Sequence, residues 1–352
     1  MGMKNAVLVA QLIRKPPYKN IGDYIQSLAG KIFFDTVDEY IERDKLSEYK
    51  SESGNKAKMI MNAWYMKNPE NWPPSDDILP LLISMRISPS VASRMMTAEG
   101  INYLKKYGPV GCRDKYTEAL LKQHDIPCYF SACLTLVLGE KYKTHHKKNR
   151  ILFVDPYFEF TRLLAVNSFK SLCYGIVNYS KIKQLQKIFN HNKIISAKRK
   201  KLENILSFVK VSAFYKTYSS SFDDSLLLNA EYITHRVKVG ENTPIVSVEE
   251  KIDYAESLIR KYAEASLVIT SMLHCALPCV GLETPVIFTT DEDGNVRQKG
   301  RFGGIIELFD QIAYVTKNRL VFKEHKKTDY VSLKNALIKR VKEFIQQDTD
   351  DQ

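Results

Sequence analysis

The chain has 352 residues, 44% of them hydrophobic, and a formal net charge of +12 at pH 7. This length is typical of two domains and the composition supports a globular fold, while no run approaches the roughly 18 apolar residues that cross a membrane. The first residues lead directly into a strand-like segment, so we expect no signal peptide.

The positive charge is concentrated between Lys141 and Lys216, where 17 lysine and arginine residues outnumber three acidic ones. The net positive charge of this stretch therefore exceeds that of the whole chain. A localised basic face indicates an anionic partner, either lipid headgroups, nucleic acid or a phosphate-bearing substrate. The alternative is a helical insertion whose charges are merely solvated.

Six cysteines are scattered along the chain, and no two of them form a CxxC pair. Cys275 and Cys279 are four residues apart, but they have no second pair of ligands nearby in the sequence. Structural zinc needs four ligands at set spacings, so we expect buried free thiols instead.

The first part of the chain, residues 1–140, is predicted to be an N-terminal Rossmann-like domain in which strands alternate with helices. Asp114 is a suitable N-cap for one of these helices. Strands are expected at Ala6–Leu12, Lys58–Trp64, Leu79–Ile83 and Cys128–Ser131, and helices at about Tyr24–Ala29 and at Lys115–Gln123.

The second part, residues 141–346, is predicted to be a C-terminal Rossmann-like domain that includes a basic helical insertion at about 157–205. Ser247 and Glu250 have the spacing of a capping box. Residues 347–352 are expected to form a frayed tail. Strands are expected at Ile151–Val154, Phe208–Ala213, Tyr232–Thr234, Leu267–Thr270, Val286–Thr289 and Ile312–Val315.

This alternation predicts an α/β fold of two Rossmann-like, doubly wound domains that face each other across a cleft. The cleft is the default binding site. Within it, His274 follows the strand Leu267–Thr270 and begins a helix. A histidine at the carboxyl end of a buried strand can contact a ligand and transfer a proton near neutral pH. The alternative is a structural histidine.

Seven motifs, spread over nearly the whole chain, resemble those of the polysaccharide pyruvyl transferase family and occur in the family's order. They are Asn20-Ile-Gly-Asp23, Asn68-Pro-Glu-Asn-Trp-Pro-Pro-Ser75, Val110-Gly-Cys-Arg-Asp114, Tyr129-Phe-Ser-Ala-Cys-Leu-Thr135, Ile233-Thr-His235, Thr270-Ser-Met-Leu-His-Cys-Ala-Leu-Pro278 and Arg301-Phe-Gly-Gly304.

The resemblance implies a GT-B-like fold and transfer of a pyruvyl unit from phosphoenolpyruvate to two hydroxyls of a sugar, which gives a cyclic ketal and free phosphate. The expected setting is bacterial polysaccharide biosynthesis, with a lipid-linked acceptor at the cytoplasmic face of the membrane. We expect no cofactor and no metal ion, because the Asp291-Glu-Asp293 sequence has the character of a turn.

The reaction needs an acid, a base and cationic side chains that bind the anionic donor. These needs assign roles to residues within the motifs. Each of three residues also has an alternative, structural interpretation: Asp23 caps a helix, Arg113 forms a surface salt bridge and His235 is a core histidine. The expected residues are His274 and Asp23 for catalysis; Arg113, Arg301, Arg86 and Ser271 for the donor anion; and Asn20, Gly22, Ser131, His235 and Phe302 for the substrate.

Two positions depart from the family pattern. Met272 stands where members commonly carry an arginine that holds the donor, and Arg86 stands where many carry histidine. Because methionine cannot bind an anion, we expect either that Arg86 supplies the missing cation or that the donor has changed. A changed donor would make the chain a glycosyltransferase that uses a nucleotide-activated sugar. Loss of donor use altogether would leave an inactive binding subunit of a polysaccharide-assembly complex.

The basic insertion interleaves aromatic residues that can stack on bases, but no nucleic-acid-binding motif accompanies it. We therefore expect no nucleic acid as a partner. Helices with lysine on one side and apolar residues on the other can lie at the surface of an anionic membrane, and we expect a peripheral association of that kind.

Overall fold

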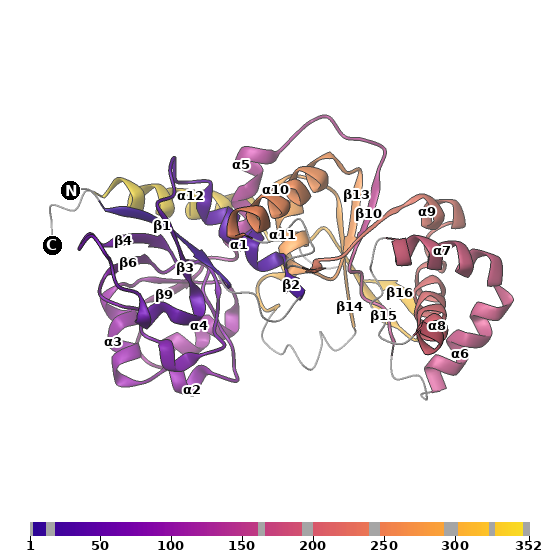
Figure 1. Cartoon of the computed structure of the whole chain (residues 1–352), viewed down its shortest axis with the longest axis horizontal. Helices are drawn as coiled ribbons and strands as arrows, with labels where there is room; N and C mark the ends of the chain where they lie inside the picture. Colours follow the sequence, from indigo (N-terminus) through magenta and orange to yellow (C-terminus); the bar gives the residue numbers. More distant parts are fainter. Residues whose placement is uncertain are drawn as a thin grey trace.

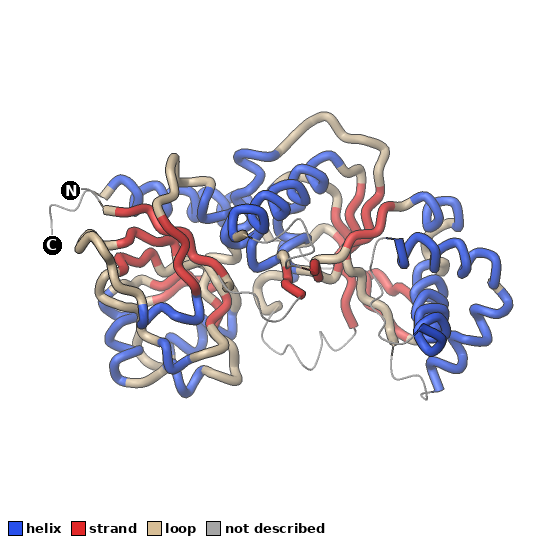
Figure 2. The backbone as a smooth tube through the Cα atoms, viewed as in Figure 1, coloured by secondary structure: helices blue, strands red, loops and turns tan. Residues whose placement is uncertain are grey.

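The computed structural model describes residues 3–11, 18–160, 166–191, 200–238, 247–291, 302–323 and 328–347. The fold is mixed α/β, with two main sheets, helices between them and further helices outside (Figure 1). Figure 2 shows the strands of the two sheets as separate red groups on either side of a central helical layer.

The first sheet has the order β3-β1-β4-β6, and all its strands are parallel. The alternating pattern of the N-terminal part thus gives the predicted α/β unit. Two short parallel pairs and the outer helices complete it. The strands are β1 (Lys4–Val9), β3 (Glu39–Glu42), β4 (Ala57–Ile60), β5 (Trp64–Tyr65), β6 (Ile78–Leu81), β7 (Arg86–Ile87), β8 (Val110–Cys112) and β9 (Cys128–Phe130), and the helices are η1 (Arg43–Glu48), η2 (Pro69–Asn71), α2 (Ala92–Met95), α3 (Ala98–Lys106) and α4 (Lys115–Lys122).

The second sheet has the order β11-β10-β13-β14-β15-β16, in which only the edge strand β16 runs antiparallel. Strands β10, β13 and β14 are mostly buried, which explains their continuous apolar sequences. The strands are β10 (Ile151–Val154), β11 (Glu231–Ile233), β13 (Leu267–Thr270), β14 (Val286–Asp291), β15 (Gln311–Thr316) and β16 (Arg319–Phe322), and the 3-10 turn η5 (Ile306–Leu308) precedes β15.

A central layer of helices joins the two sheets. It consists of α1 (Gly22–Lys31), η3 (Leu134–Leu138), α5 (Gly139–Tyr142), α10 (Val248–Glu264) and α11 (Leu273–Gly281). One hydrophobic cluster runs from Val7 in β1 to Val154 in β10 through this layer. At its tightest point, a Cβ on Gly139 would lie 1.9 Å from the Gly281 carbonyl oxygen, so only glycine lets these backbones meet.

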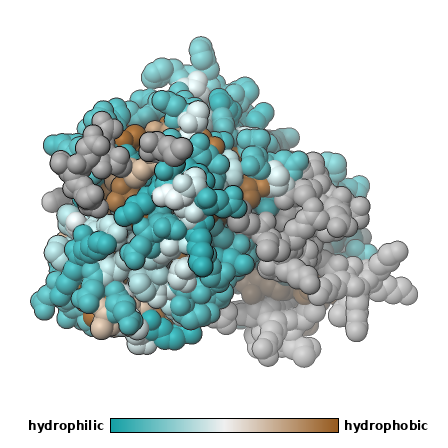
Figure 3. Space-filling model, turned by 60° about the vertical axis from the view of Figure 1, so that its left-hand side comes forward, coloured by the Kyte–Doolittle hydropathy of each residue, from teal (hydrophilic) through white to brown (hydrophobic). Residues whose placement is uncertain are grey.

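The last helix, α12 (Tyr330–Gln346), returns to the first sheet (Figure 1). There the Lys58 Nζ donates hydrogen bonds of 2.9 Å to the Ile345 and Gln347 carbonyls. Residues 348–352 of the predicted frayed tail lie outside the described residues. The face turned forward in Figure 3 is mostly hydrophilic, with hydrophobic residues showing only in small areas.

The basic insertion is helical, as predicted, but its bounds differ. It contains α6 (Val166–Val177), α7 (Tyr179–His191) and α8 (Lys200–Tyr218), and α9 (Asp224–Asn229) follows. The predicted strand Phe208–Ala213 is wrong, because these residues lie within α8. This helix buries side chains on several sides, including Phe208, Val209 and Val211. An apolar run of that length does not distinguish a buried helix from a buried strand.

Other local predictions are confirmed. Asp114 caps α4 by accepting a hydrogen bond of 2.9 Å from the Thr117 amide, and Ser247 and Glu250 form the capping box of α10. Of the remaining predicted strands, Ile151–Val154 and Leu267–Thr270 have the predicted ends, Lys58–Trp64 is divided between β4 and β5, and the others appear with shifted ends. Within the described residues, no helix is both long and apolar enough to cross a bilayer.

Candidate functional site

A cleft of about 530 Å³ lies where strands of both sheets end. Its wall includes residues that follow β1, β3, β10, β11 and β13 at their carboxyl ends, the edge at which α/β sheets bind ligands. The lining residues are Ala10, Gln11, Asn20, Asp23, Tyr24, Arg43, Lys67, Asp155, His235, Arg236 and Met272.

The first motif, Asn20 to Asp23, links the two halves of the molecule. The strands β2 (Tyr18–Asn20) and β12 (Arg236–Lys238) pair antiparallel, and the Ile21 amide donates to the His235 carbonyl at 2.8 Å. The Asn20 Oδ1 accepts a hydrogen bond of 3.1 Å from the Gly22 amide. Ile21 occupies the N-cap without a side-chain bond, while Asp23 lies in the first turn of α1 and lines the cleft. Asp23 is therefore not the cap of this helix.

His274 lies in the first turn of α11 and is 7% exposed. It meets the start of α1, because a Cβ on Gly22 would lie 3.1 Å from the His274 Nδ1 and 3.2 Å from its Cβ. Gly22 thus allows the first turns of the two helices to approach closely. His274 therefore lies beside the Asn20–Asp23 motif, although the two are far apart in the sequence.

Asp155 is a polar residue at the cleft that sequence reasoning did not single out. It follows β10, has a left-handed φ of 39°, and accepts a hydrogen bond of 2.6 Å from the His235 amide. Its own carbonyl accepts one of 2.6 Å from the Ser271 hydroxyl. Burial raises the pKa of the Asp155 carboxyl, and the His235 amide opposes that shift. The Asp-Pro pair directly after a buried strand was the signal in the sequence.

His235 lines the cleft, but its side chain is buried in the core. The ring Nε2 lies 2.7 Å from the Tyr262 hydroxyl, and burial lowers the pKa of His235 from 6.5 to about 4. The imidazole is therefore neutral at pH 7. Its main-chain carbonyl holds Ile21, so the geometry favours a positioning role for this residue.

The buried neutral state of His235 predicts a loss of stability in acid. The unfolded histidine takes up a proton below about pH 6.5 while the folded one resists until about pH 4, so unfolding binds a proton in this window. Falling pH should lower the free energy of unfolding by about 3 kcal/mol across it. Urea denaturation of wild type and His235→Gln as a function of pH tests this. Equal pH dependence of the two proteins would contradict the assignment.

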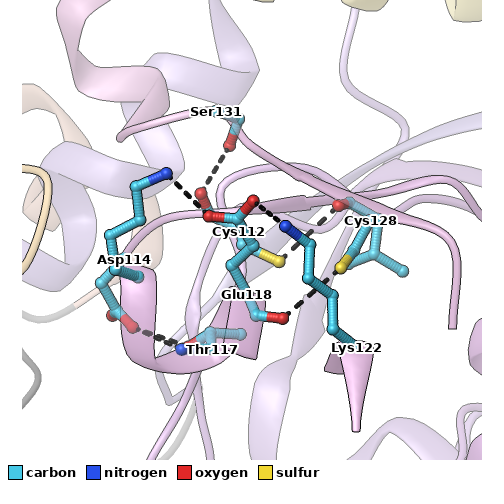
Figure 4. Close-up of polar contacts among 9 residues, drawn as sticks. Cys112, Asp114, Thr117, Glu118, Lys122, Cys128 and Ser131 are labelled. Atoms are coloured by element: carbon cyan, nitrogen blue, oxygen red, sulfur yellow. Dashed lines mark hydrogen bonds and ion pairs between the residues drawn. The ribbon is translucent and has the colours of Figure 1, made fainter. Parts of the chain in front are cut away.

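A second polar cluster surrounds the start of α4. The Arg86 Nε lies 3.4 Å from the Asp114 Oδ2. The Asp114 Oδ1 accepts 2.9 Å bonds from the Thr117 amide and hydroxyl, and Figure 4 shows Asp114 and Thr117 in contact. Burial raises the pKa of Asp114, although Arg113, Thr117 and Arg86 oppose the shift. Burial lowers the pKa of Arg86 to about 10, which leaves it charged at pH 7. Arg113 is 2% exposed, so it is not part of a surface salt bridge.

Ser131 and the last motif lie beside this cluster. The buried Ser131 hydroxyl donates to the Cys112 carbonyl at 3.2 Å, a contact visible in Figure 4. The Gly303 carbonyl accepts a 3.0 Å bond from the Lys115 amide, and Phe302 packs on Phe288 with ring centroids 5.5 Å apart. Arg301 lies outside the described residues.

A family model for polysaccharide pyruvyl transferase matches residues 94–292, which is more than half of the chain. The chain belongs to the polysaccharide pyruvyl transferase family. Family membership indicates a transferase with a sugar acceptor. No curated protein matches the chain.

The two residues that depart from the family pattern, Met272 and Arg86, lie in different places. Met272 lines the cleft, whereas Arg86 and Arg113 do not and instead surround Asp114. The cleft has three other cationic residues, Arg43, Lys67 and Arg236, none of which was predicted. Only Arg236 had a sequence signal, since it follows the Ile233-Thr-His235 motif.

The three cations differ in their freedom to bind a ligand. Arg43 is 2% exposed and paired with Asp44 at 3.0 Å, so it forms part of the wall. Lys67 and Arg236 are exposed at the rim. Among the described residues, no three histidine, cysteine or acidic side chains gather in a group able to hold a metal ion.

Proposed function

We propose that this protein transfers a pyruvyl unit from phosphoenolpyruvate to a saccharide and forms a pyruvate ketal. The observation that supports this most is the arrangement of Asp23 and the exposed cation Arg236 in one cleft, with His274 packed against Gly22, the neighbour of Asp23. It combines a proton-transferring histidine with groups suited to an anionic donor and to sugar hydroxyls.

The donor carries a carboxylate and a phosphate, each of which needs cationic or N–H contacts. Arg236 and Lys67 supply these contacts from the rim, in place of the arginine that Met272 replaces. The N-terminal end of α11 adds a favourable helix dipole for an anion. Arg301, which follows from the family resemblance, and Ser271 remain proposed donor contacts.

The chemistry requires two additions to one carbon. A proton goes to the vinyl carbon of the donor while one sugar hydroxyl bonds to the neighbouring carbon and gives up its proton. The phosphate then leaves with the electron pair of its C–O bond, and the second hydroxyl bonds to the same carbon and gives up its proton to a base, which closes the ketal. His274 acts as the acid or base beside the reacting carbon, and Asp23 positions or deprotonates a sugar hydroxyl.

A second candidate function rests on Met272. With no arginine at this position, the same cleft can accept a nucleotide-activated sugar, whose pyrophosphate also suits a helix N-terminus. The chain would then be a glycosyltransferase. A binding subunit without donor use is the third possibility, and the polar residues retained in the cleft argue against it.

We further propose that residues 1–140 and 141–346 form two Rossmann-like domains in a GT-B-like arrangement. The two sheets, and the cleft at the carboxyl ends of both, support this division. The expected acceptor is a lipid-linked saccharide of bacterial polysaccharide biosynthesis, used at the cytoplasmic face of the membrane.

Thermal unfolding with candidate donors tests the proposal. Phosphoenolpyruvate should raise the Tm of the wild-type protein, since a ligand that binds only the folded state stabilises it, whereas CMP, UDP and GDP should not. Arg236→Ala should remove most of the shift, and Arg319→Ala, an exposed arginine on β16, should keep it. Stabilisation by one nucleotide alone would establish the glycosyltransferase reading instead.

A further inference from the structure

The helix α6 carries an apolar stripe that faces solvent. Phe169, Ile176 and Val177 are 67%, 61% and 84% exposed, and Cys173 is exposed between them. These positions follow the i, i+4, i+7, i+8 spacing of one helix face. In a helix of a soluble domain, that face normally points to the core.

The opposite face of α6 carries small residues and packs on α8. Ser171 is 1% exposed, and a Cβ on Gly175 would lie 2.0 Å from the Ser212 hydroxyl oxygen. Close packing through small residues fixes which side of α6 points outward. The apolar stripe therefore cannot be buried by a simple rotation of the helix within this fold.

The neighbouring helices α7 and α8 do not carry such an exposed apolar stripe. In α7, Ile182, Leu185 and Phe189 are buried, and most apolar residues of α8 between Phe208 and Tyr218 are buried too. From the sequence, several helices were expected to face a membrane. In the structure the exposed apolar stripe lies on α6, and the only large exposed hydrophobic residues in the described parts of α7 and α8 are Tyr179 (57%) and Ile205 (54%). Figure 1 shows α6 at the outer edge of the molecule, beyond both sheets.

We propose that the exposed face of α6 docks on an anionic lipid bilayer. The described residues of α6, α7 and α8 include eight lysines and a single acidic residue, Glu203, so an anionic partner is favoured. Lys170 is exposed beside Phe169. Apolar side chains among lysines are what an interfacial helix offers to acyl chains and headgroups.

Other occupants fit the face less well. Nucleic acid is bound through phosphate contacts and base stacking, and the aliphatic side chains of Ile176 and Val177 provide neither. A second copy of the chain would bring two strongly basic surfaces together. The proposal rests on the proposed function in one respect, since a lipid-linked acceptor is reached at a membrane.

Vesicle co-sedimentation of the full chain tests the docking. Binding to vesicles of phosphatidylglycerol and phosphatidylcholine should exceed binding to phosphatidylcholine alone and weaken at high salt. The double variant Ile176→Asp/Val177→Asp should reduce the partition coefficient about 10-fold or more, since two apolar side chains are lost from the interface. Val331→Asp, at an exposed apolar position on α12, is the matched control and should bind like wild type.

A second variant protects the test against misfolding. Lys170→Glu changes only an exposed charge and should weaken binding to the anionic vesicles alone. Equal binding of wild type to both vesicle types, or unchanged binding of the double variant, would overturn the proposal. So would self-association of the wild-type chain that the double variant loses without any change in vesicle binding. The Tm shift with phosphoenolpyruvate, measured on the same variants, reports separately on the proposed function.

Discussion

His274→Ala is expected to lower kcat/KM for pyruvyl transfer by about 10²–10⁴-fold, the usual contribution of a positioned acid or base. The histidine lies in the first turn of α11 against Gly22, between Asn20 and Asp23, which line the cleft where the donor is proposed to react. Phosphate release in the presence of a saccharide acceptor measures the effect. Donor affinity should change much less, because the rim cations remain.

Gly22→Ala is the matched positional variant for this prediction. Its new Cβ would lie 3.1 Å from the His274 Nδ1, so the ring must shift by a few tenths of an ångström while its chemistry is unchanged. We expect a smaller fall in kcat with little change in KM. Retention of full activity by His274→Ala would show that this histidine is structural.

Asp114→Asn is expected to lower the free energy of unfolding by about 3–5 kcal/mol, the typical cost of removing one partner from a buried charge cluster. The change keeps an N-cap for α4 but removes the negative charge that Arg86 and the buried Arg113 share. Urea denaturation measures the loss.

Glu118→Gln serves as the control, because it removes a carboxylate from the same helix. Glu118 pairs with Lys115 and Lys122, both largely exposed, and such pairs contribute about 0–1 kcal/mol. Figure 4 shows its contact with Lys122 at the other side of the cluster. If Asp114→Asn lowered the free energy of unfolding no more than this control does, the two arginines would have found other partners.

Much of the fold could be predicted because local signals and burial agree. The apolar run Leu267–Thr270 became β13, and the polar residues after it mark the carboxyl end where His274 lies. The strand predicted at Phe208–Ala213 failed because α8 is covered by neighbours on several sides, so its sequence lacks a polar face. Periodicity carries little information where a helix is buried on several sides.

The candidate site could be predicted only in part. His274 and Asp23 belong to motifs and lie in the first turns of their helices, so the carboxyl-edge rule could point to both. Asp155, Arg43 and Lys67 reach the same cleft only because the order of strands in both sheets brings them there. Arg86 and Arg113 were assigned to the donor by their charge, yet the structure surrounds Asp114 with them, a pairing that no sequence spacing revealed.

The most direct test of the central claim is the transfer of labelled carbon from phosphoenolpyruvate. The purified protein would be incubated with phosphoenolpyruvate labelled in its carbon skeleton and with lipid-linked saccharides extracted from the source cells. We predict that label enters the saccharide as an acid-labile ketal, with one phosphate released for each ketal, and that His274→Ala abolishes both. Unchanged phosphoenolpyruvate, together with sugar transfer from a nucleotide sugar under the same conditions, would contradict the proposal.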